Sequence, residues 1–386
     1  MKSVIGIIYD TNFDEDQING ACGGSETWAI QLSKELVTNG YSVIVFRQGD
    51  WQISNCLVEY CPIHMFDYIC ERIHFDSIIF SRNIDDLYYK IIESKCCDNI
   101  YVQAHEIYIW KNGLYNEKFD YKIDNEKYPE IKKFIALSDF HKDALTYYCN
   151  IPQEKIEIIG NGCDTSTFKE IDESNGDVNK SIEHSILWTS CFPRGCDILI
   201  DDIMPLVKKE IPDFIVKICG YIDVIPEQYR NRNDVEIVGF NLTKAEYYNE
   251  LRKTACWFYP CVTGETFNIS VLDAVINNCD IISPMLHGTN YTLSPFMPFA
   301  MKNKFGTGET KNKNYDWGSY TTDKSSEEYN EACQEAANMI IDSIKNYYDI
   351  ERIKIRQSIK RYVLQTHNWK EVANRWKIVM NKNGKQ

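Results

Sequence analysis

Short, continuous apolar runs alternate with helical patterns along most of this chain. The first half has such runs at 4–9, 42–46, 77–80, 100–103, 134–137 and 156–159, and the second half has them at 186–189, 214–219, 235–238, 257–259 and 280–283. Continuous apolar strands separated by helices are typical of a parallel sheet that is covered on both faces. The sequence therefore predicts an α/β protein built from two doubly wound, Rossmann-like halves.

A polar segment separates the two series of strands. Residues 169–183 are acidic and contain Gly and Asn, as an exposed connection does. Because single hydrophobic cores stop growing at about 250–300 residues, a chain of 386 residues is expected to form two domains. We place an N-terminal domain at 1–175, a C-terminal domain at 176–355 and a final helix at 356–386. Residues 302–331 are expected to form a long surface loop.

The charge balance disfavours a nucleic-acid partner. The chain has 42 Lys and Arg against 56 Asp and Glu, a net charge of −14, and a field of that sign repels phosphate backbones. Basic residues gather only in 339–386, where eleven Lys and Arg face four acidic residues. This segment is interpreted as a solvated helix face, with contact to an anionic membrane surface as the alternative.

The cysteines and the start of the sequence favour a cytoplasmic protein. The fifteen cysteines are odd in number and scattered, so a disulfide framework is not expected. They also lack the paired spacing and nearby His of a zinc site, and no structural metal is predicted. The first apolar stretch, 3–8, is too short for a signal sequence or a transmembrane segment.

The loop after the first strand carries paired glycines, Gly23 and Gly24. Ser25 is placed to cap the following helix and Gly40 to end it. Adjacent glycines let a ligand approach the backbone closely, although a plain tight turn would also use them. The loop is not G-x-G-x-x-G, and Arg47 instead of an acid ends the second strand, so a nicotinamide dinucleotide site is disfavoured.

Two further segments, both in the second half, are candidates for binding phosphate. Arg194 and Gly195 lie between a strand and the helix that follows it, where a guanidinium can bond to phosphate oxygens. A second helix is expected from Asn268, and the backbone amides of Asn268, Ile269 and Ser270 would be unpaired donors at its positive end. The positive N-terminus of this helix is therefore suited to binding a diphosphate.

Two carboxylates accompany this second helix. Glu265 precedes it and Asp273 lies on it, so about 12 Å of helical rise separates them at roughly 1.5 Å per residue. They cannot act as a paired acid/base dyad on one atom, but they could hold two parts of one extended ligand. In the alternative interpretation, Glu265 only caps the helix and Asp273 is solvated.

Several segments, in this order, are similar to motifs of the retaining GT-B glycosyltransferases of family 4, the glycosyl transferases group 1. They are the GGSE loop at 23–26, the segment 134–168 with its Asn-Gly-x-Asp-x-x-x-Phe ending, the Arg194-Gly195 turn, the loop 238–240, Glu265 with Asp273, and the terminal segment 366–376. The similarity spans nearly the whole chain. It implies two Rossmann-like domains that face each other across a cleft, with the last helix crossing back to the first domain.

The resemblance also implies roles for individual residues. Glu265 would contact the donor sugar beside its anomeric centre, and His105 would lie near the transferred sugar, although a lone His after a strand is more often a structural residue. The diphosphate would be bound by Arg194, Gly195, Asn268, Ile269 and Ser270, the ribose by Asp273, and the base by the loop with Gly239 and Phe240. The cleft would be lined by Gly23, Gly24, Ser138 and Asn161.

Two positions depart from the family's pattern. Asp273 replaces a Glu, which shortens the side chain by one methylene, and Ser190 lies where many members have Arg. Arg194 is then the one obvious cation in its loop. Helix-end amides, or another cation such as Arg82, would have to complete the phosphate site.

The expected function is retaining transfer of a hexose-type sugar from a UDP- or GDP-sugar to a hydroxyl acceptor of the glycan, lipid-linked glycan or protein glycan class. No metal and no cofactor are expected. The alternative is a catalytically silent sugar-nucleotide-binding or scaffold protein of the same fold.

Overall fold

The computed structural model describes residues 2–13, 23–107, 109–111, 123, 126–165, 181–220, 224–240, 242–262, 264–284, 286–289, 300–305 and 323–383. The chain divides into two compact units. Unit 1 consists mainly of the chain up to Gly162 together with Trp369–Gln386, and unit 2 mainly of Cys163–Asn368. The boundary expected after residue 175 falls within 166–180, which lies outside the described residues.

Unit 1 is built on a mostly parallel sheet with the strand order β10-β9-β7-β5-β1-β2-β4-β3. Only β3 runs antiparallel to its neighbour. The strands of this sheet are β1 (Val4–Asn12), β2 (Ser42–Gln48), β3 (Gln52–Ile53), β4 (Glu59–Pro62), β5 (Ser77–Ser81), β7 (Ile100–Gln103), β9 (Ile131–Ala136) and β10 (Ile156–Ile158). A separate short pair joins β6 (Asn83–Ile84) to β8 (Trp110–Lys111).

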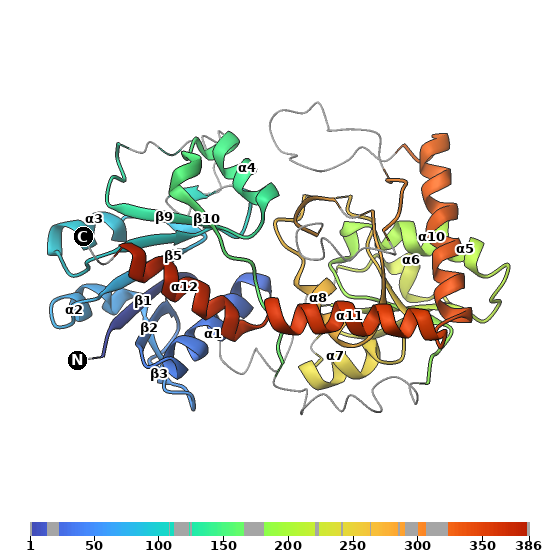
Figure 1. Cartoon of the computed structure of the whole chain (residues 1–386), viewed down its shortest axis with the longest axis horizontal. Helices are drawn as coiled ribbons and strands as arrows, with labels where there is room; N and C mark the ends of the chain where they lie inside the picture. Colours follow the sequence, from blue (N-terminus) through green and yellow to red (C-terminus); the bar gives the residue numbers. More distant parts are fainter. Residues whose placement is uncertain are drawn as a thin grey trace. The chain divides into compact units, whose positions relative to one another are not determined.

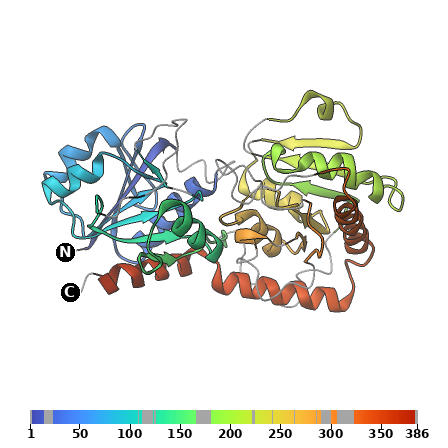
Figure 2. The same ribbon diagram turned by 90° about the horizontal axis from the view of Figure 1, so that it is seen from above.

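Helices cover both faces of this sheet (Figures 1 and 2). Successive residues of β1 point to opposite faces, so Ile7 packs in the core beneath one set of helices and Ile8 in the core beneath the other. On the Ile7 side lie α1 (Gly24–Thr38) and α12 (Trp369–Asn383). The remaining helices are η2 (Ile63–Met65), α2 (Phe66–Cys70), α3 (Leu87–Ser94), α4 (Asp139–Cys149) and η3 (Gln153–Lys155).

Unit 2 contains two groups of parallel strands. One has the order β11-β12-β13 and the other pairs β14 with β15, and β11 lies in contact with β14. β11 and β14 are therefore neighbours in unit 2, although they are far apart in the sequence. The strands are β11 (Ser185–Trp188), β12 (Ile215–Cys219), β13 (Val235–Gly239), β14 (Cys256–Phe258) and β15 (Asp280–Ile282).

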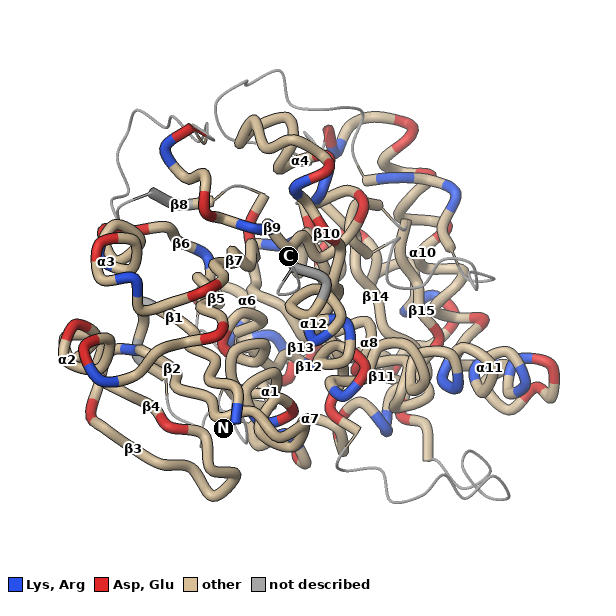
Figure 3. The backbone as a smooth tube through the Cα atoms, turned by 60° about the vertical axis from the view of Figure 1, so that its left-hand side comes forward, with Lys and Arg blue, Asp and Glu red and all other residues tan. Residues whose placement is uncertain are grey.

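The helices of unit 2 include a π-helical turn, η5 (Ile198–Ile203), that continues directly into α5 (Met204–Val207). The others are η4 (Phe192–Arg194), α6 (Glu227–Arg230), α7 (Lys244–Leu251), α8 (Ile269–Ile276), α10 (Glu327–Lys345) and α11 (Ile350–Thr366). Helix α11 carries both basic and acidic positions (Figure 3). Two of its basic residues, Arg352 and Arg356, point into the protein and pair with the fully buried Asp280 at the start of β15.

The structure corrects the expected end of the chain. Instead of one helix over 356–386, α11 ends at Thr366 in unit 2 and α12 begins at Trp369 in unit 1. The break has a local cause, because Nδ2 of Asn368 donates to the carbonyl of Leu364 (2.7 Å) and satisfies the open end of α11. The loop expected over 302–331 was also too long, since α10 begins at Glu327.

Every apolar run predicted as a strand overlaps one, whereas the short strands β3, β4, β6 and β8 were not predicted. The predicted start of the first helix was also wrong. Gly23 is the N-cap of α1, and the Ser25 hydroxyl is instead 2.9 Å from that of Tyr9. Gly40 follows the C-cap with φ +92°, as predicted. No described helix is long and apolar enough to cross a lipid bilayer.

Candidate functional site

The point in unit 2 where the strand order reverses lies between β11 and β14. In open α/β sheets, ligands bind at the carboxyl ends of the strands at such a point. Arg194 follows β11, Glu265 follows β14, and Nη1 of Arg194 donates to Oε1 of Glu265 at 2.6 Å. The two residues that the sequence singled out are therefore brought together at the carboxyl edge of the unit 2 sheet.

A glycine makes this approach possible. Gly195 ends the turn η4 with φ +106°, which side-chain-bearing residues rarely adopt. A Cβ at this position would lie 2.6 Å from Cγ of Pro260, in the loop that leads to Glu265. The turn that carries Arg194 thus packs directly against that loop.

The Glu265 carboxylate is almost completely enclosed. Its side chain is 11% exposed, whereas that of Arg194 is 41% exposed. The hydroxyl of Tyr259 also donates to Glu265 Oε1, and burial together with this carboxylate holds the pKa of Tyr259 well above its usual value. Glu265 is therefore a fixed acceptor, and the guanidinium beside it is accessible to a ligand.

Helix α8 begins four residues after Glu265, at Ile269, with Asn268 as its N-cap. Oδ1 of Asn268 accepts from the backbone N–H of Val271 at 3.3 Å. Glu265 therefore does not cap this helix, which rules out the alternative considered from the sequence. The amides of Ile269 and Ser270 lie in the first turn, where the helix supplies no acceptor, and both residues are partly exposed.

Asp273, one turn further along α8, is not solvated. Its side chain is 5% exposed, Oδ2 accepts from Nζ of Lys244 at 2.8 Å, and Oδ1 accepts from the hydroxyl of Tyr248 at 2.7 Å. Burial, and then the negative charge of Asp273, raises the pKa of Tyr248 well above its usual value. The carboxylate thus has an internal partner on each oxygen.

Gly239 ends β13 and Phe240 follows it, at the same edge of the unit 2 sheet. Gly239 has φ +154°, and its carbonyl accepts from the backbone N–H of Gly220, which follows β12. Phe240 is partly exposed. The structure places both residues near the start of α7, which carries Lys244.

Unit 1 has its own polar cluster, where the strand order reverses between β1 and β5. Arg82, directly after β5, has φ +71°, and Nε and Nη2 both donate to Oε1 of Glu106 at 3.1 and 2.5 Å. Nη1 lies 4.0 Å from Oε1 of Glu26, which belongs to the first turn of α1. Burial lowers the pKa of Arg82, but the ion pair with Glu106 outweighs it and raises the pKa overall. Arg82 is thus engaged within unit 1.

His105 belongs to this cluster. Its Nε2 lies 3.1 Å from Oγ of Ser81, and its ring packs edge-on against Trp28. Burial, followed by the positive charge of Arg82, lowers the pKa of His105 well below its usual value. The imidazole is therefore neutral near pH 7. It can form hydrogen bonds but carries no positive charge.

The other predicted residues of unit 1 differ in accessibility. Gly23 is partly exposed and Gly24 exposed at the start of α1. Ser138 is completely buried and caps α4, with Oγ accepting from the backbone N–H of His141 (3.1 Å). Asn161 is 3% exposed, and its Oδ1 accepts no hydrogen bond within the described part of the chain. Ser138 therefore has a structural role at this edge.

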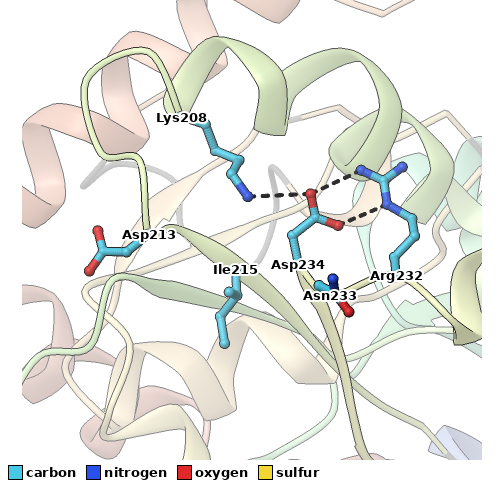
Figure 4. A pocket seen from close by; sticks show the side chains of 6 residues that line it. All are labelled: Lys208, Asp213, Ile215, Arg232, Asn233 and Asp234. Atoms are coloured by element: carbon cyan, nitrogen blue, oxygen red, sulfur yellow. Dashed lines mark hydrogen bonds and ion pairs between the residues drawn. The ribbon is translucent and has the colours of Figure 1, made fainter.

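A charged hollow lies at the opposite edge of the unit 2 sheet, near the amino ends of β12 and β13 (Figure 4). It has a volume of about 480 Å³ and is lined by Lys208, Asp213, Ile215, Arg232, Asn233 and Asp234. Asp234 pairs with Lys208 at 3.3 Å and with Arg232 at 2.9 Å. Because Lys208 and Arg232 are already paired with Asp234, and because the hollow lies away from the strands' carboxyl ends, it is not the candidate site.

The sequence pointed to Arg194, Glu265 and Asp273, but it missed their partners Tyr259, Lys244 and Tyr248. The pattern Thr243-x-x-Glu246 is a capping box and could have located the start of α7. No sequence signal indicates that Lys244 reaches α8. Among the described residues, no group of three His, Cys, Asp or Glu side chains is arranged to hold a metal ion.

No model of a protein family matches the sequence, and no curated protein is similar to it. Solved structures share its fold. A glycosyltransferase from Rickettsia africae ESF-5 has a TM-score of 0.66 at 13% identity, with 100% of this chain and 99% of that one covered. Sucrose-phosphate synthase from Thermosynechococcus elongatus has a TM-score of 0.63 at 12% identity, with 99% of each chain covered. Anabaena HepE in complex with UDP and glucose has 0.61 at 13%, with 99% of this chain and 100% of that one covered. The predicted GT-B fold is confirmed.

Proposed function

We propose that this protein is a retaining glycosyltransferase that moves a hexose-type sugar from a UDP- or GDP-sugar to a hydroxyl acceptor without a metal ion. The observation that carries the proposal is the Arg194–Glu265 pair beside the start of α8, at the reversal point of the unit 2 sheet. The solved structures named above support it, since HepE was determined with UDP and glucose. UDP-glucose is therefore the first donor to test.

The difficult step is separation of the sugar from the diphosphate, because negative charge develops on the leaving oxygen. Preoriented hydrogen-bond donors aimed at that charge are usually the largest contribution to catalysis. Arg194 and the amides of Ile269 and Ser270 would supply these donors. Glu265, held by Tyr259, would accept hydrogen bonds from hydroxyls of the sugar and fix its orientation.

Retention follows if the acceptor hydroxyl attacks from the face that the diphosphate leaves. The bond from C1 of the sugar to the phosphate oxygen breaks, and a bond from C1 to the acceptor oxygen forms. The acceptor's proton passes to the phosphate oxygen, so no protein base is needed. The neutral His105 would serve as a hydrogen-bonding group towards the transferred sugar.

Transfer and slow donor hydrolysis across a panel of UDP-, GDP- and ADP-sugars test the proposal. Glu265→Gln should lower the turnover by about 10²-fold or more, because a preoriented contact at the reacting sugar is lost. Glu227→Gln, at an exposed position of α6, is the matched control and should keep the wild-type rate. Nucleotide binding without turnover for any donor and acceptor would instead favour the catalytically silent protein.

A further inference from the structure

Lys244 occupies a position that the stability of its own helix does not explain. It is the first residue of α7, whose N-terminus is fixed by the capping box of Thr243 and Glu246, with hydrogen bonds of 3.2 and 2.8 Å. A cation at a helix N-terminus meets the positive end of the helix dipole and is unfavourable there. Interactions outside α7 must therefore account for the position of this ammonium group.

The surroundings of Lys244 hold its ammonium group in one place. Nζ donates to Oδ2 of Asp273 at 2.8 Å and lies 5.1 and 4.7 Å from the ring centres of Tyr247 and Tyr248. The hydroxyl of Tyr248 bonds to the other oxygen of Asp273, which fixes the carboxylate in turn. An ammonium has three N–H donors, and Nζ makes one hydrogen bond within the described residues. Donors therefore remain for a ligand.

Exposure differs sharply between the two partners of this ion pair. The side chain of Lys244 is 23% exposed, whereas that of Asp273 is 5% exposed. A ligand at this edge of the sheet would meet the ammonium before the carboxylate. The ribose contact was expected at Asp273, whose side chain is shorter than the Glu found at this position in the similar family. Lys244 is the better placed of the two residues to contact a ribose.

A second buried ion pair in unit 2 provides the contrast. Asp280 pairs with Arg352 and Arg356, but it lies at the amino end of β15, and the side chain of Arg356 is only 2% exposed. That cluster anchors α11, and Arg352, whose side chain is 16% exposed, also pairs with Asp342. Lys244 lies instead at the strands' carboxyl edge, and its partner Asp273 is four residues beyond Ile269 on α8, or about 6 Å of helical rise at roughly 1.5 Å per residue. A nucleotide's ribose follows its diphosphate over a similar span.

We propose that Lys244 donates hydrogen bonds to the ribose hydroxyl oxygens of the donor nucleotide, and that Asp273 and Tyr248 are the positioning residues that aim its ammonium group. This inference rests on the proposed function. It assigns the recognition of ribose to a hydrogen-bond donor, where a carboxylate acceptor was expected.

The test is the binding of UDP, 2′-deoxy-UDP and 3′-deoxy-UDP to the full-length protein by calorimetry. Wild type should prefer UDP to at least one deoxy analogue by about tenfold, because a donor is left without its acceptor. Lys244→Ala should weaken UDP binding and bring that ratio close to one. Lys244→Arg should keep the preference, and Asp273→Asn should reduce it.

Lys253→Ala is the matched control, since Lys253 follows the other end of α7 and pairs with Glu250. If circular dichroism finds Lys244→Ala unfolded, Lys244→Gln takes its place, with the same loss of preference expected. If the folded Lys244 variant keeps the wild-type preference for UDP over the deoxy analogues, the inference is overturned. It is also overturned if wild type binds UDP and both deoxy analogues equally well. An equal loss for all three nucleotides would assign Lys244 to the phosphates and overturn it too. Wild type that binds no nucleoside diphosphate would instead remove the proposed function.

Discussion

Nη1 of Arg194 lies 2.6 Å from Oε1 of Glu265, although 71 positions separate the two residues in the chain. The contact joins the loops after β11 and β14, on either side of the point where the strand order of unit 2 reverses. Helix α8 starts four residues after Glu265. A guanidinium, a carboxylate and a helix N-terminus thus meet at the one edge where open α/β sheets bind ligands.

Gly195→Ala should destabilise unit 2 and weaken nucleotide binding. The new Cβ would meet Cγ of Pro260 at 2.6 Å, and the position has φ +106°, so we expect a loss of about 2–3 kcal/mol in the free energy of unfolding. Urea denaturation measures it. Gly40→Ala separates the clash with Pro260 from the cost of a positive φ, since Gly40 has φ +92° but nothing within 4 Å of a Cβ. This substitution should cost about 1 kcal/mol. Equal losses would contradict a steric role for Pro260.

Asp280→Ala should destabilise the protein strongly by leaving the positive charges of Arg352 and Arg356 without their buried partner. Removing one member of a buried ion pair costs about 3–5 kcal/mol. Both arginines bond to Asp280, at 2.6 and 3.1 Å, and its carboxylate is fully buried. The control is Glu210→Ala, which removes an exposed ion pair with Lys345 and should leave the urea midpoint nearly unchanged. Similar midpoints for both variants would contradict the anchoring of α11.

Stability should fall between pH 7 and pH 5, partly because of His141. Burial lowers its pKa to about 4 from an unfolded value of 6.5. Below pH 6.5 the unfolded chain therefore binds a proton that the folded protein does not, so stability is fully present above this pH and is lost as pH falls. The loss at pH 5 is about 2 kcal/mol from this residue.

Urea denaturation at both pH values checks this expectation. His141→Gln should be less stable at pH 7, since the imidazole bonds the backbone of Leu137 and Glu106 at 3.0 and 2.6 Å. Its stability should nevertheless depend less on pH than that of wild type. If His141→Gln lost as much stability between pH 7 and pH 5 as wild type does, the assignment of this loss to His141 would be contradicted.

The sequence was sufficient for the positions of the buried strands and for the loops that follow them. Continuous apolar runs predicted the strands, and because parallel strands end at a common edge, Arg194 and Glu265 could be singled out. Short strands such as β3 and β6 carry too few residues to show a period. They form because neighbouring strands supply their hydrogen-bond partners.

The partners of the site residues were beyond such reasoning. Lys244 reads as an exposed residue after a helix cap, and nothing in the sequence indicates that its side chain reaches Asp273 on α8. Tyr259 reads as the end of an apolar strand, and its hydroxyl reaches Glu265 because the loop after β14 turns back on itself. Contacts between side chains of separate elements depend on tertiary packing, which a periodicity does not encode.

The most direct measurement is the affinity of wild type and Arg194→Ala for UDP by titration calorimetry. Arg194→Ala should bind UDP at least about tenfold more weakly, since charge-assisted hydrogen bonds to the diphosphate are lost. Arg232→Ala, which removes a guanidinium at the opposite edge of the same unit, should bind like wild type. Tight UDP binding that is unaffected by Arg194→Ala would contradict the assignment of the diphosphate to this site.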